Sequence, residues 1–430
     1  MSIVLAEPAS PGLAAQAPET PAAVNARLAR DLAGATASVT PGQSNRDVVQ
    51  YFKEHPNQTA LPVVEDGVPI GIINRGIFLT GFTQPFHREI YERKSCIAFM
   101  DKTPLVVDAE VPVPELGRLA VQAGAKVLQD GFLVTERGRF LGLGTGLDLL
   151  QALGHLEAER NRVIHESIAY AEIIQGSLLG TSRRELESAG LPDQHLLWQP
   201  RDHVGGDAFY ARRVDRDGHR GLFLALMDCT GHGVPGAFTA MLMTSFLGHA
   251  LDLAHPWEPE QVLAVVNRRV KEELGQGKRL DGQGESQHPG ADEGMDATCL
   301  WLDAAGPEVR FAGAKHSLWS FAPGAAEPEE VRGDKAGVGY LETADDQAWT
   351  RHTLAFEPGT VLVATTDGIV DQIGGPRRIA FGKRRLWDAF RSGPAGLGLR
   401  GRLERCQEAM AAYQGGEPRR DDVSLLAIRR

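Results

Sequence analysis

The stretch that decides the fold of the second half of the chain is Leu222-Phe-Leu-Ala-Leu-Met-Asp-Cys-Thr-Gly-His-Gly-Val-Pro-Gly-Ala-Phe-Thr-Ala-Met241. Its first six residues form a short apolar run, which is typical of a buried strand. The run ends on a carboxylate, Asp228, and a glycine-dense turn leads into a helical pattern from Ala237. Because glycine lets a ligand approach the backbone closely, this Asp could hold a metal ion. Taken alone, the stretch favours an ordinary turn with a solvated Asp.

Three further acids share this setting, and they change the interpretation. Each lies at the end of a predicted strand beside a turn: Asp207, Asp367 and Asp421. If these strands lie side by side, the carboxylates converge, and they repel each other unless they are protonated or bridged by cations. Oxygen ligands suit Mg²⁺ or Mn²⁺ rather than zinc. Two such ions about 3.5–4 Å apart can activate a water for attack on phosphorus.

Composition limits the classes of protein that the chain can belong to. The 430 residues predict two or three domains, at about 150 residues per domain. The formal net charge of -11 argues against a general nucleic-acid or anionic-membrane binder. The four scattered cysteines are typical of reduced thiols in a cytosolic protein and give no zinc pattern. We find no apolar run of about 20 residues and no secretory signal, so we expect a cytoplasmic protein.

The order of composition along the chain predicts four segments. Residues 1–44 are rich in Ala and Pro and predict a disordered leader, with room for a short helix near 23–32. Residues 45–153 predict a repeated α/β domain, 154–190 a linker helix and 191–430 a strand-rich domain with helices between its strands. Within the last domain, the polar, glycine-rich run 275–294 predicts a mobile loop.

An internal repeat organises residues 45–153. The segment Leu61-Pro-Val-Val-Glu-Asp-Gly-Val-Pro-Ile-Gly-Ile-Ile-Asn74 matches Phe132-Leu-Val-Thr-Glu-Arg-Gly-Arg-Phe-Leu-Gly-Leu-Gly-Thr145 at an offset of 71 residues. Each copy predicts strand, turn, strand and helix, and a helical pattern precedes each copy, at 48–55 and at 114–128. This pair resembles two cystathionine-beta-synthase (CBS) modules. The resemblance implies an adenine-nucleotide contact at Thr145 and Asp148, for which helix capping is an equally good explanation.

One long helix is predicted from Leu147 to about Leu179, with Gly180 and Thr181 as its stop. Leu149, Leu156, Val163 and Tyr170 recur at heptad spacing, which favours a short coiled coil and a homodimer contact. Packing of an amphipathic helix on its own domain explains much of the same pattern, so both interpretations stay open.

The acidic motifs together resemble one family. Gly205-Gly-Asp207, Asp228-Cys-Thr-Gly-His-Gly233, Thr365-Thr-Asp-Gly368 and Asp421-Asp-Val-Ser424 look like the motif series of the metal-dependent protein phosphatases (PPM), in the bacterial SpoIIE/RsbU-like branch. The match covers about 194–430. It implies an α+β protein whose C-terminal domain is an αββα sandwich, joined by a connecting helix to the CBS-pair-like α/β domain. It also implies two metal ions, Mn²⁺ or Mg²⁺, at one end of the sandwich.

The resemblance assigns roles residue by residue. Asp228 would bridge both metals and the backbone carbonyl of Cys229 would bind one of them. Asp367 and Asp421 would bind the other metal, with Asp422 able to stand in for Asp421. Asp207 would hold metal-bound waters. A bridging hydroxide would then attack a phosphoserine or phosphothreonine.

The sequence assigns less certain roles to four other residues. His232 is two residues out of step with the general acid of eukaryotic relatives, so packing or a water contact is the better expectation. Asp296 could hold a third, weak metal or simply end a loop. Lys315 and His316, after a predicted strand, could contact phosphate.

The sequence therefore predicts a cytoplasmic protein serine/threonine phosphatase of bacterial signalling, regulated by the CBS-like domain. The resemblance suggests a phosphorylated STAS-type anti-sigma-factor antagonist, or a similar regulator, as its partner. The alternative is a catalytically inactive, nucleotide-sensing scaffold. A diguanylate cyclase is rejected, because Ala208 replaces the acid that would follow Gly205-Gly206-Asp207.

Overall fold

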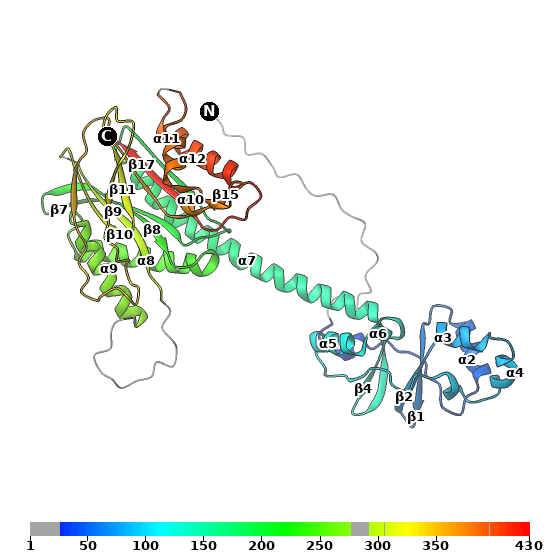
Figure 1. The fold of residues 1–430 in the computed structure, drawn as a ribbon. Helices are drawn as coiled ribbons and strands as arrows, with labels where there is room; N and C mark the ends of the chain where they lie inside the picture. The colour runs from blue at the N-terminus through cyan, green and yellow to red at the C-terminus, as the bar shows by residue number, and fades with distance from the viewer. Residues whose placement is uncertain (1–25, 277–291, 305, 395) are drawn as a thin grey trace, which may run out of the picture. The chain divides into compact units, whose positions relative to one another are not determined.

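The computed structural model describes residues 26–276, 292–304, 306–394 and 396–430, and the chain divides into two compact units after Ile164 (Figure 1). The predictions made for residues 1–25 and for most of the loop 275–294 lie outside the described residues.

The first unit contains two β-hairpins surrounded by short helices. Its elements are η1 (Ala29–Leu32), α2 (Asn45–Glu54), β1 (Ala60–Glu65), β2 (Val68–Asn74), α3 (Arg75–Phe82), α4 (His87–Tyr91), η2 (Cys96–Phe99), β3 (Val106–Asp108), α5 (Val113–Ala123), α6 (Lys126–Asp130), β4 (Phe132–Glu136), β5 (Arg139–Gly144) and the start of α7 (Gly146–Glu187).

The two hairpins, β1–β2 and β4–β5, confirm the repeat seen in sequence. Their registers shift at the same place, between Val63 and Val64 in one and between Val134 and Thr135 in the other. Their turns also match, because Asp66 and Arg137 both have a φ of 51° and each precedes a glycine. The repeat therefore extends to the backbone conformation of single residues.

Residues 26–44 correct the prediction of a disordered leader. Ala29 and Leu32 are buried in the core of the second hairpin, and the helix expected near 23–32 is reduced to the single 3₁₀ turn η1. Val39 pairs alongside Val63 and is almost fully buried. The order of this segment could not be predicted from its Ala- and Pro-rich composition, because that order comes from pairing with distant strands and not from local propensity.

The helix predicted over 114–128 is two helices, α5 and α6. Gly124 separates them with a φ of 85°, and its N–H closes the end of α5 on the carbonyl of Ala120. Glycine reaches this left-handed region at no steric cost, so it ends the helix where the hydrophobic pattern continues.

The long helix α7 runs on to Glu187, so the predicted stop at Gly180 and Thr181 is wrong. Leu179 and Leu186 are buried in the core of the second unit, and this tertiary contact outweighs the weak helix propensity of Gly180. Of the heptad residues of α7, Leu149 near its N-terminal end is buried in the first unit. Tyr170, further along the helix, is 66% exposed.

The second unit is the predicted αββα sandwich (Figure 1). One sheet has the strand order β13-β10-β9-β8-β7 and the other has β12-β11-β14-β17-β6, with all neighbours antiparallel. The elements of the first sheet and its helices are β7 (Asp207–Arg216), β8 (His219–Cys229), α8 (Gly233–Leu253), α9 (Pro259–Leu274), β9 (Met295–Asp303), β10 (Glu308–Ala314) and β13 (His352–Ala355). Those of the second are β6 (Asp193–Gln199), β11 (Ser317–Phe321), β12 (Glu329–Arg332), β14 (Val361–Thr365), α10 (Gly368–Asp371), β15 (Ile373–Gly374), β16 (Ile379–Ala380), α11 (Gly382–Arg391), α12 (Leu399–Gln414) and β17 (Val423–Arg429).

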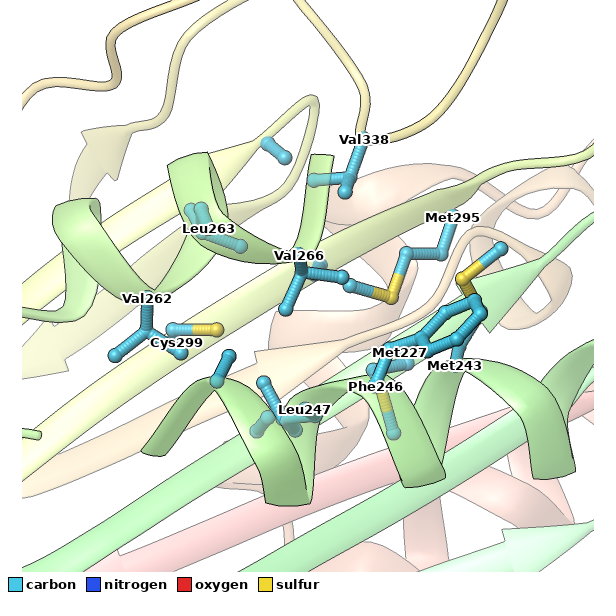
Figure 2. Packing of buried hydrophobic residues seen from close by; sticks show 14 of the residues in the cluster. Met227, Met243, Phe246, Leu247, Val262, Leu263, Val266, Met295, Cys299 and Val338 are labelled. Carbon is cyan, nitrogen blue, oxygen red and sulfur yellow. The ribbon is translucent and has the colours of Figure 1, made fainter. Parts of the chain in front are cut away.

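Three apolar layers hold the sandwich together. One lies between the two sheets, one between the first sheet and α8 and α9, and one between the second sheet and α11 and α12. Figure 2 shows the layer under α8 and α9, where these side chains meet: Met227, Met243, Phe246, Leu247, Val262, Leu263, Val266, Met295 and Cys299.

Helix α8 has the length and hydropathy of a membrane span, which the sequence inspection missed, and no other helix in the described ranges does. Its apolar residues are explained by the sandwich, because Met243 and Leu247 are buried against β8 and β9. All four cysteines are unpaired and buried: Cys96, Cys229, Cys299 and Cys406.

Candidate active site

Strand β8 aims Asp228 into the space between the two sheets. Successive strand residues point to opposite faces. Phe223, Ala225 and Met227 pack toward α8 and α9, whereas Leu222, Leu224 and Leu226 pack toward the second sheet. Asp228 continues the second set and is half-buried at the end of the apolar layer. The carboxylate therefore stands where the hydrophobic interior gives way to polar groups.

Two neighbouring strands place an acid directly beside Asp228. In the ladder of β7 and β8, Asp207 is the partner of Asp228, and in the ladder of β8 and β9 its partner is Asp296. Directly opposed residues have Cβ atoms about 4.5–5.5 Å apart. The three acids form one row across the first sheet, all on its inner face.

The second sheet contributes the acids Asp367 and Asp421 at the same end. Strands β14 and β17 pair from Val361 and Arg429 to Thr365 and Leu425, so the residues just beyond that last pair are neighbours. Asp367 follows β14 as the N-cap of α10, and Asp421 lies just before β17. The four acids predicted to converge thus come from both sheets and meet at one edge of the sandwich.

Burial and mutual repulsion raise the pKa values of these acids. Burial raises the pKa of Asp207 to about 8, with added repulsion from Asp422 and Asp421. Burial, followed by the charges of Asp207 and Asp367, holds the pKa of Asp228 well above its usual range. Partial loss of solvent and then the charge of Asp421 raise the pKa of Asp367 to about 6. Without a cation, this cluster resists carrying its full negative charge.

Asp422 has a different environment from Asp421. Its Oδ1 accepts a hydrogen bond from Arg201 N at 2.6 Å, and its Oδ2 accepts one from Gly206 N at 2.6 Å. The Asp422 carboxylate therefore holds the Gly205-Gly206 turn, whereas Oδ1 of Asp421 accepts the N–H of Asp422 at 2.9 Å. Of the two adjacent acids, Asp421 has the side chain more open to a ligand.

The Cys229 carbonyl lies against Gly206 in a space that fits only glycine. A Cβ on Gly206 would lie 2.6 Å from Cys229 O and 2.4 Å from Gly231 O. Cys229 N also donates to Gly206 O at 3.3 Å. The thiol of Cys229 points into the layer under α8, so only its carbonyl is available to the site.

The donor set fits hard divalent ions. It consists of carboxylates and a carbonyl, without a thiolate or imidazole, which is the chemistry that Mg²⁺ and Mn²⁺ select. Among the residues that the structure describes, no three His, Cys, Asp or Glu side chains are gathered tightly enough to form a finished metal site. The raised pKa values of Asp228 and Asp367 show that added positive charge would be favourable here.

The remaining predicted residues lie outside this cluster. His232 Nδ1 lies 3.3 Å from Asp202 Oδ2, on the exposed turn before α8. In the first unit, Thr145 Oγ1 donates to Asp148 Oδ2 at 2.6 Å and accepts from Asp148 N at 3.1 Å. That pair is arranged as a helix cap at the start of α7.

Two residues of the site were missed in sequence. Thr366 Oγ1 donates to Asp207 Oδ2 at 2.8 Å, and the alternation along β14 could have revealed that this side chain faces inward. Gln175 of α7 donates from Nε2 to Gly205 O at 2.7 Å and accepts from Gly205 N at 3.2 Å. No local pattern marks such a contact between residues 30 positions apart.

Two protein-family models match parts of this chain. The family described as Stage II sporulation protein E (SpoIIE) matches residues 218–430, and the CBS domain family matches residues 30–80. None of the curated proteins matches the chain.

Solved structures extend the comparison. The chain is 30% identical to the SiaA PP2C domain of Pseudomonas aeruginosa, with a TM-score of 0.53, and the match covers 64% of this chain and 99% of that one. It is 19% identical to the RsbU and RsbW domains of Rv1364c from Mycobacterium tuberculosis (TM-score 0.41, covering 56% and 60%). It is 13% identical to the SpoIIE phosphatase structure from Bacillus subtilis (TM-score 0.41, covering 55% and 61%). Together with the fold, the SpoIIE match and the SiaA match show that this chain belongs to the SpoIIE-type PPM protein serine/threonine phosphatases and carries an N-terminal CBS domain.

Proposed function

We propose that the chain dephosphorylates phosphoserine or phosphothreonine on a bacterial regulatory protein, with a STAS-type anti-sigma-factor antagonist as the leading candidate. The observation that carries this proposal is the convergence of Asp207 and Asp228 with Asp367 and Asp421 at one edge, from two different sheets. Without a cation, a cluster of acids so placed costs stability, because the carboxylates repel each other.

Each residue would have a distinct part in the reaction. Asp228 would hold both metals, Cys229 O would bind one and Asp367 and Asp421 the other, and Asp207 would orient water. Divalent ions at this edge would lower the pKa of water and neutralise charge on the transferring phosphoryl group. Mn²⁺ and Mg²⁺ both fit the oxygen donors. Asp422 would position the backbone around Gly206 rather than bind metal.

We further propose that helix α7 couples the site to a regulatory signal. The Gln175 side chain holds both backbone groups of Gly205 and is almost fully buried. The next residue, Gly206, binds Asp422 and lies against Cys229 O. A shift of α7 by a fraction of an ångström would therefore move the backbone that shapes the site.

Capping residues support the proposed adenine-nucleotide site, and exposed residues of α7 support the proposed homodimer. An adenine nucleotide would bind the first unit near Thr145 and Asp148, in exchange for their mutual hydrogen bonds. A homodimer would form through α7, where Tyr170 and Ile173 are each 66% exposed. We expect the protein to work in the cytoplasm.

Manganese-dependent hydrolysis distinguishes an active phosphatase from an inactive scaffold. The substrates are a purified phosphorylated partner and a small phenyl phosphate. Replacing Asp228 with Asn should lower kcat at least about 100-fold, the scale for removing one electrostatic group from an active site. Asp215→Asn is a matched control, because Asp215 is an exposed acid on β7 that pairs only loosely with Arg220, at 3.9 Å. If wild type and Asp228→Asn are equally inactive on both substrates, the inactive scaffold is the correct description.

Regulation is tested in the full chain. Gln175→Ala should lower activity and weaken its response to adenine nucleotides. Ser177→Ala should do neither, because the Ser177 hydroxyl bonds only within α7, to Ile173 O at 2.8 Å. Equal activities and equal nucleotide responses in wild type and both variants would count against coupling through α7.

A further inference from the structure

The ammonium of Lys315 lies beside the third acid of the row, Asp296. Its Nζ is 3.7 Å from Asp296 Oδ1 and 3.6 Å from Glu342 Oε1. It also stands over the ring of Tyr340, 4.1 Å from the centroid, where a cation is attracted by the π face. The Lys315 side chain is one-third exposed and that of Asp296 about one-quarter, so the pair is only partly screened by water.

The backbone holds Lys315 in an unusual conformation. Its φ of 55° falls in the left-handed region, which long side chains rarely adopt. Unlike Asp66, Arg137 and Asp217, which precede a glycine in a hairpin turn, Lys315 connects β10 to β11, which belong to different sheets. Its N–H donates to Asp334 O at 2.7 Å. Such strain persists only where the surroundings impose it, and it concentrates at functional sites.

Close packing of glycines imposes this conformation. A Cβ on Gly313 would lie 2.3 Å from His316 O, and one on Gly333 would lie 2.4 Å from the same oxygen. The backbone of Lys315 also forms an isolated β-bridge with Ala297, the residue after Asp296. The turn therefore fixes the stem of Lys315 next to Asp296, and the side chain needs little further ordering to reach the carboxylate.

Without Lys315, Asp296 would be a candidate metal ligand. It stands opposite Asp228 in the β8–β9 ladder. Its Oδ1 is buried and has no donor within hydrogen-bond distance, while the Lys315 ammonium, at ion-pair distance, and the Tyr340 side chain both favour the charged carboxylate. A carboxylate oxygen with free lone pairs beside a cluster of acids is the kind of group that recruits a divalent ion.

We propose that Lys315 is a positioning residue that serves as a built-in cation for Asp296 and keeps this carboxylate from binding a divalent ion. The ammonium takes the place of an additional ion and confines metal binding to the acids around Asp228. This inference rests on the proposed function, because it assumes that those acids do bind metal.

The test counts the Mn²⁺ ions that the full-length protein binds, by equilibrium dialysis and by the electron paramagnetic resonance of free Mn²⁺. Lys315→Met should bind one further Mn²⁺, more weakly than the others, and the double variant with Asp296→Asn should lose it again. Lys315→Arg should bind as many ions as wild type, because it keeps the charge. Asp296→Asn alone should also match wild type, since Asp296 is not a ligand there.

A closely matched control is Lys383→Met. The Lys383 Nζ also pairs with a carboxylate, Glu330 Oε1 at 2.6 Å, and lies over an aromatic ring, that of Trp319, 5.2 Å from its centroid. The Lys383→Met substitution removes the same charge as Lys315→Met but should leave the number of bound Mn²⁺ ions unchanged.

Each outcome decides between the two proposals. If wild type binds Mn²⁺ but Lys315→Met gains none, or if Asp296→Asn alone loses an ion, the role given to Lys315 is wrong and the proposed function stands. If wild type binds no Mn²⁺ at all, the proposed function fails first. Asp296→Asn is a near-isosteric change, so its arm remains informative even if Lys315→Met does not fold.

Discussion

The hydroxyl of Thr366 donates a 2.8 Å hydrogen bond to Oδ2 of Asp207, and this contact joins the two sheets of the sandwich at the acidic edge. The same hydroxyl accepts the N–H of Ser424 at 3.0 Å. Thr366 therefore uses its donor on one sheet and its acceptor on the other. Asp207 is only 1% exposed, so this donor is important to it.

Replacing Thr366 with Val, which has nearly the same shape, should destabilise the metal-free protein by about 1–3 kcal/mol, since it leaves a buried acceptor without its donor. Urea unfolding in the presence of a chelator measures the change. Thr350→Val is the control: Thr350 Oγ1 makes a similar bond to Asp334 Oδ1, at 3.2 Å, but on the exposed surface. The control should change stability by no more than about 0.5 kcal/mol. Equal losses in both variants would contradict the role given to Thr366.

The adjacent acids Asp421 and Asp422 should respond differently to the same substitution. Asp422→Asn should destabilise the metal-free protein, because an amide cannot accept from both Arg201 N and Gly206 N as the carboxylate does. Asp421→Asn should leave the metal-free protein within about 0.5 kcal/mol of wild type but abolish most of the stabilisation by Mn²⁺. Thermal unfolding with and without Mn²⁺ separates the two. The reverse pattern would make Asp422 the ligand.

Without metal, the stability of the second unit should fall as the pH rises from about 6.5 to about 8. The pKa of Asp207 is raised to about 8, so the folded state keeps a proton that the unfolded state has already released. Stability from this group is complete below the unfolded pKa of 3.8 and is lost as the pH passes through the folded value. His316 acts in the opposite sense, because burial lowers its pKa to about 4, but its effect is confined to pH values below 6.5.

Chelator-treated protein, unfolded by heat at several pH values, measures this slope. A single group contributes at most about 1.4 kcal/mol per pH unit. Asp207→Asn should make the slope shallower, and the raised pKa of Asp228 should keep part of it. Saturating Mn²⁺ should also flatten it in wild type, because a bound cation favours the ionised acids. A metal-free protein whose stability rises over this range would refute the assignment.

Gly206→Ala should disrupt the site without touching a predicted ligand side chain. The added methyl would lie 2.4 Å from Gly231 O and 2.6 Å from Cys229 O, so the carbonyl proposed to bind metal must move. We expect at least about a 10-fold loss of Mn²⁺ affinity, as for other residues that orient metal ligands. Gly416→Ala is the control, since its added methyl meets nothing within 4 Å. Titration calorimetry measures both, and an unchanged affinity in Gly206→Ala would argue against Cys229 O as a ligand.

Local signals were enough to predict much of the fold. The hairpins of the first unit follow from alternating apolar residues and Asp-Gly or Arg-Gly turns, and the sandwich strands follow from short apolar runs between turns. The end of α7 could not be predicted, because Gly180 is a sound stop signal that is overridden by burial of Leu179 and Leu186. Residues 26–44 were misjudged for a related reason, since their order comes from contacts with residues far along the chain.

Part of the site could likewise be predicted from the sequence, and part could not. Its acids could be recognised because each one ends or begins an apolar run beside a turn. The distinct environment of Asp422 depends on the backbone of Arg201, more than 200 residues away, so the doubled acid looked ambiguous in sequence. Likewise, Gln175 and Lys315 act through partners that only the folded chain brings close.

The buried thiols offer a way to observe the layers of the molecule opening one at a time. Cys96 lies in the core of the first unit, Cys299 under α8 and α9, and Cys406 beneath α12. Burial raises the pKa of all three, so each is nearly inert to alkylating reagents until its layer opens. In variants that each retain a single one of these cysteines, the rate of thiol labelling measures local unfolding of the layer that contains it. The chain thus has a buried thiol in each of three separate cores, and each thiol can report the opening of its own core.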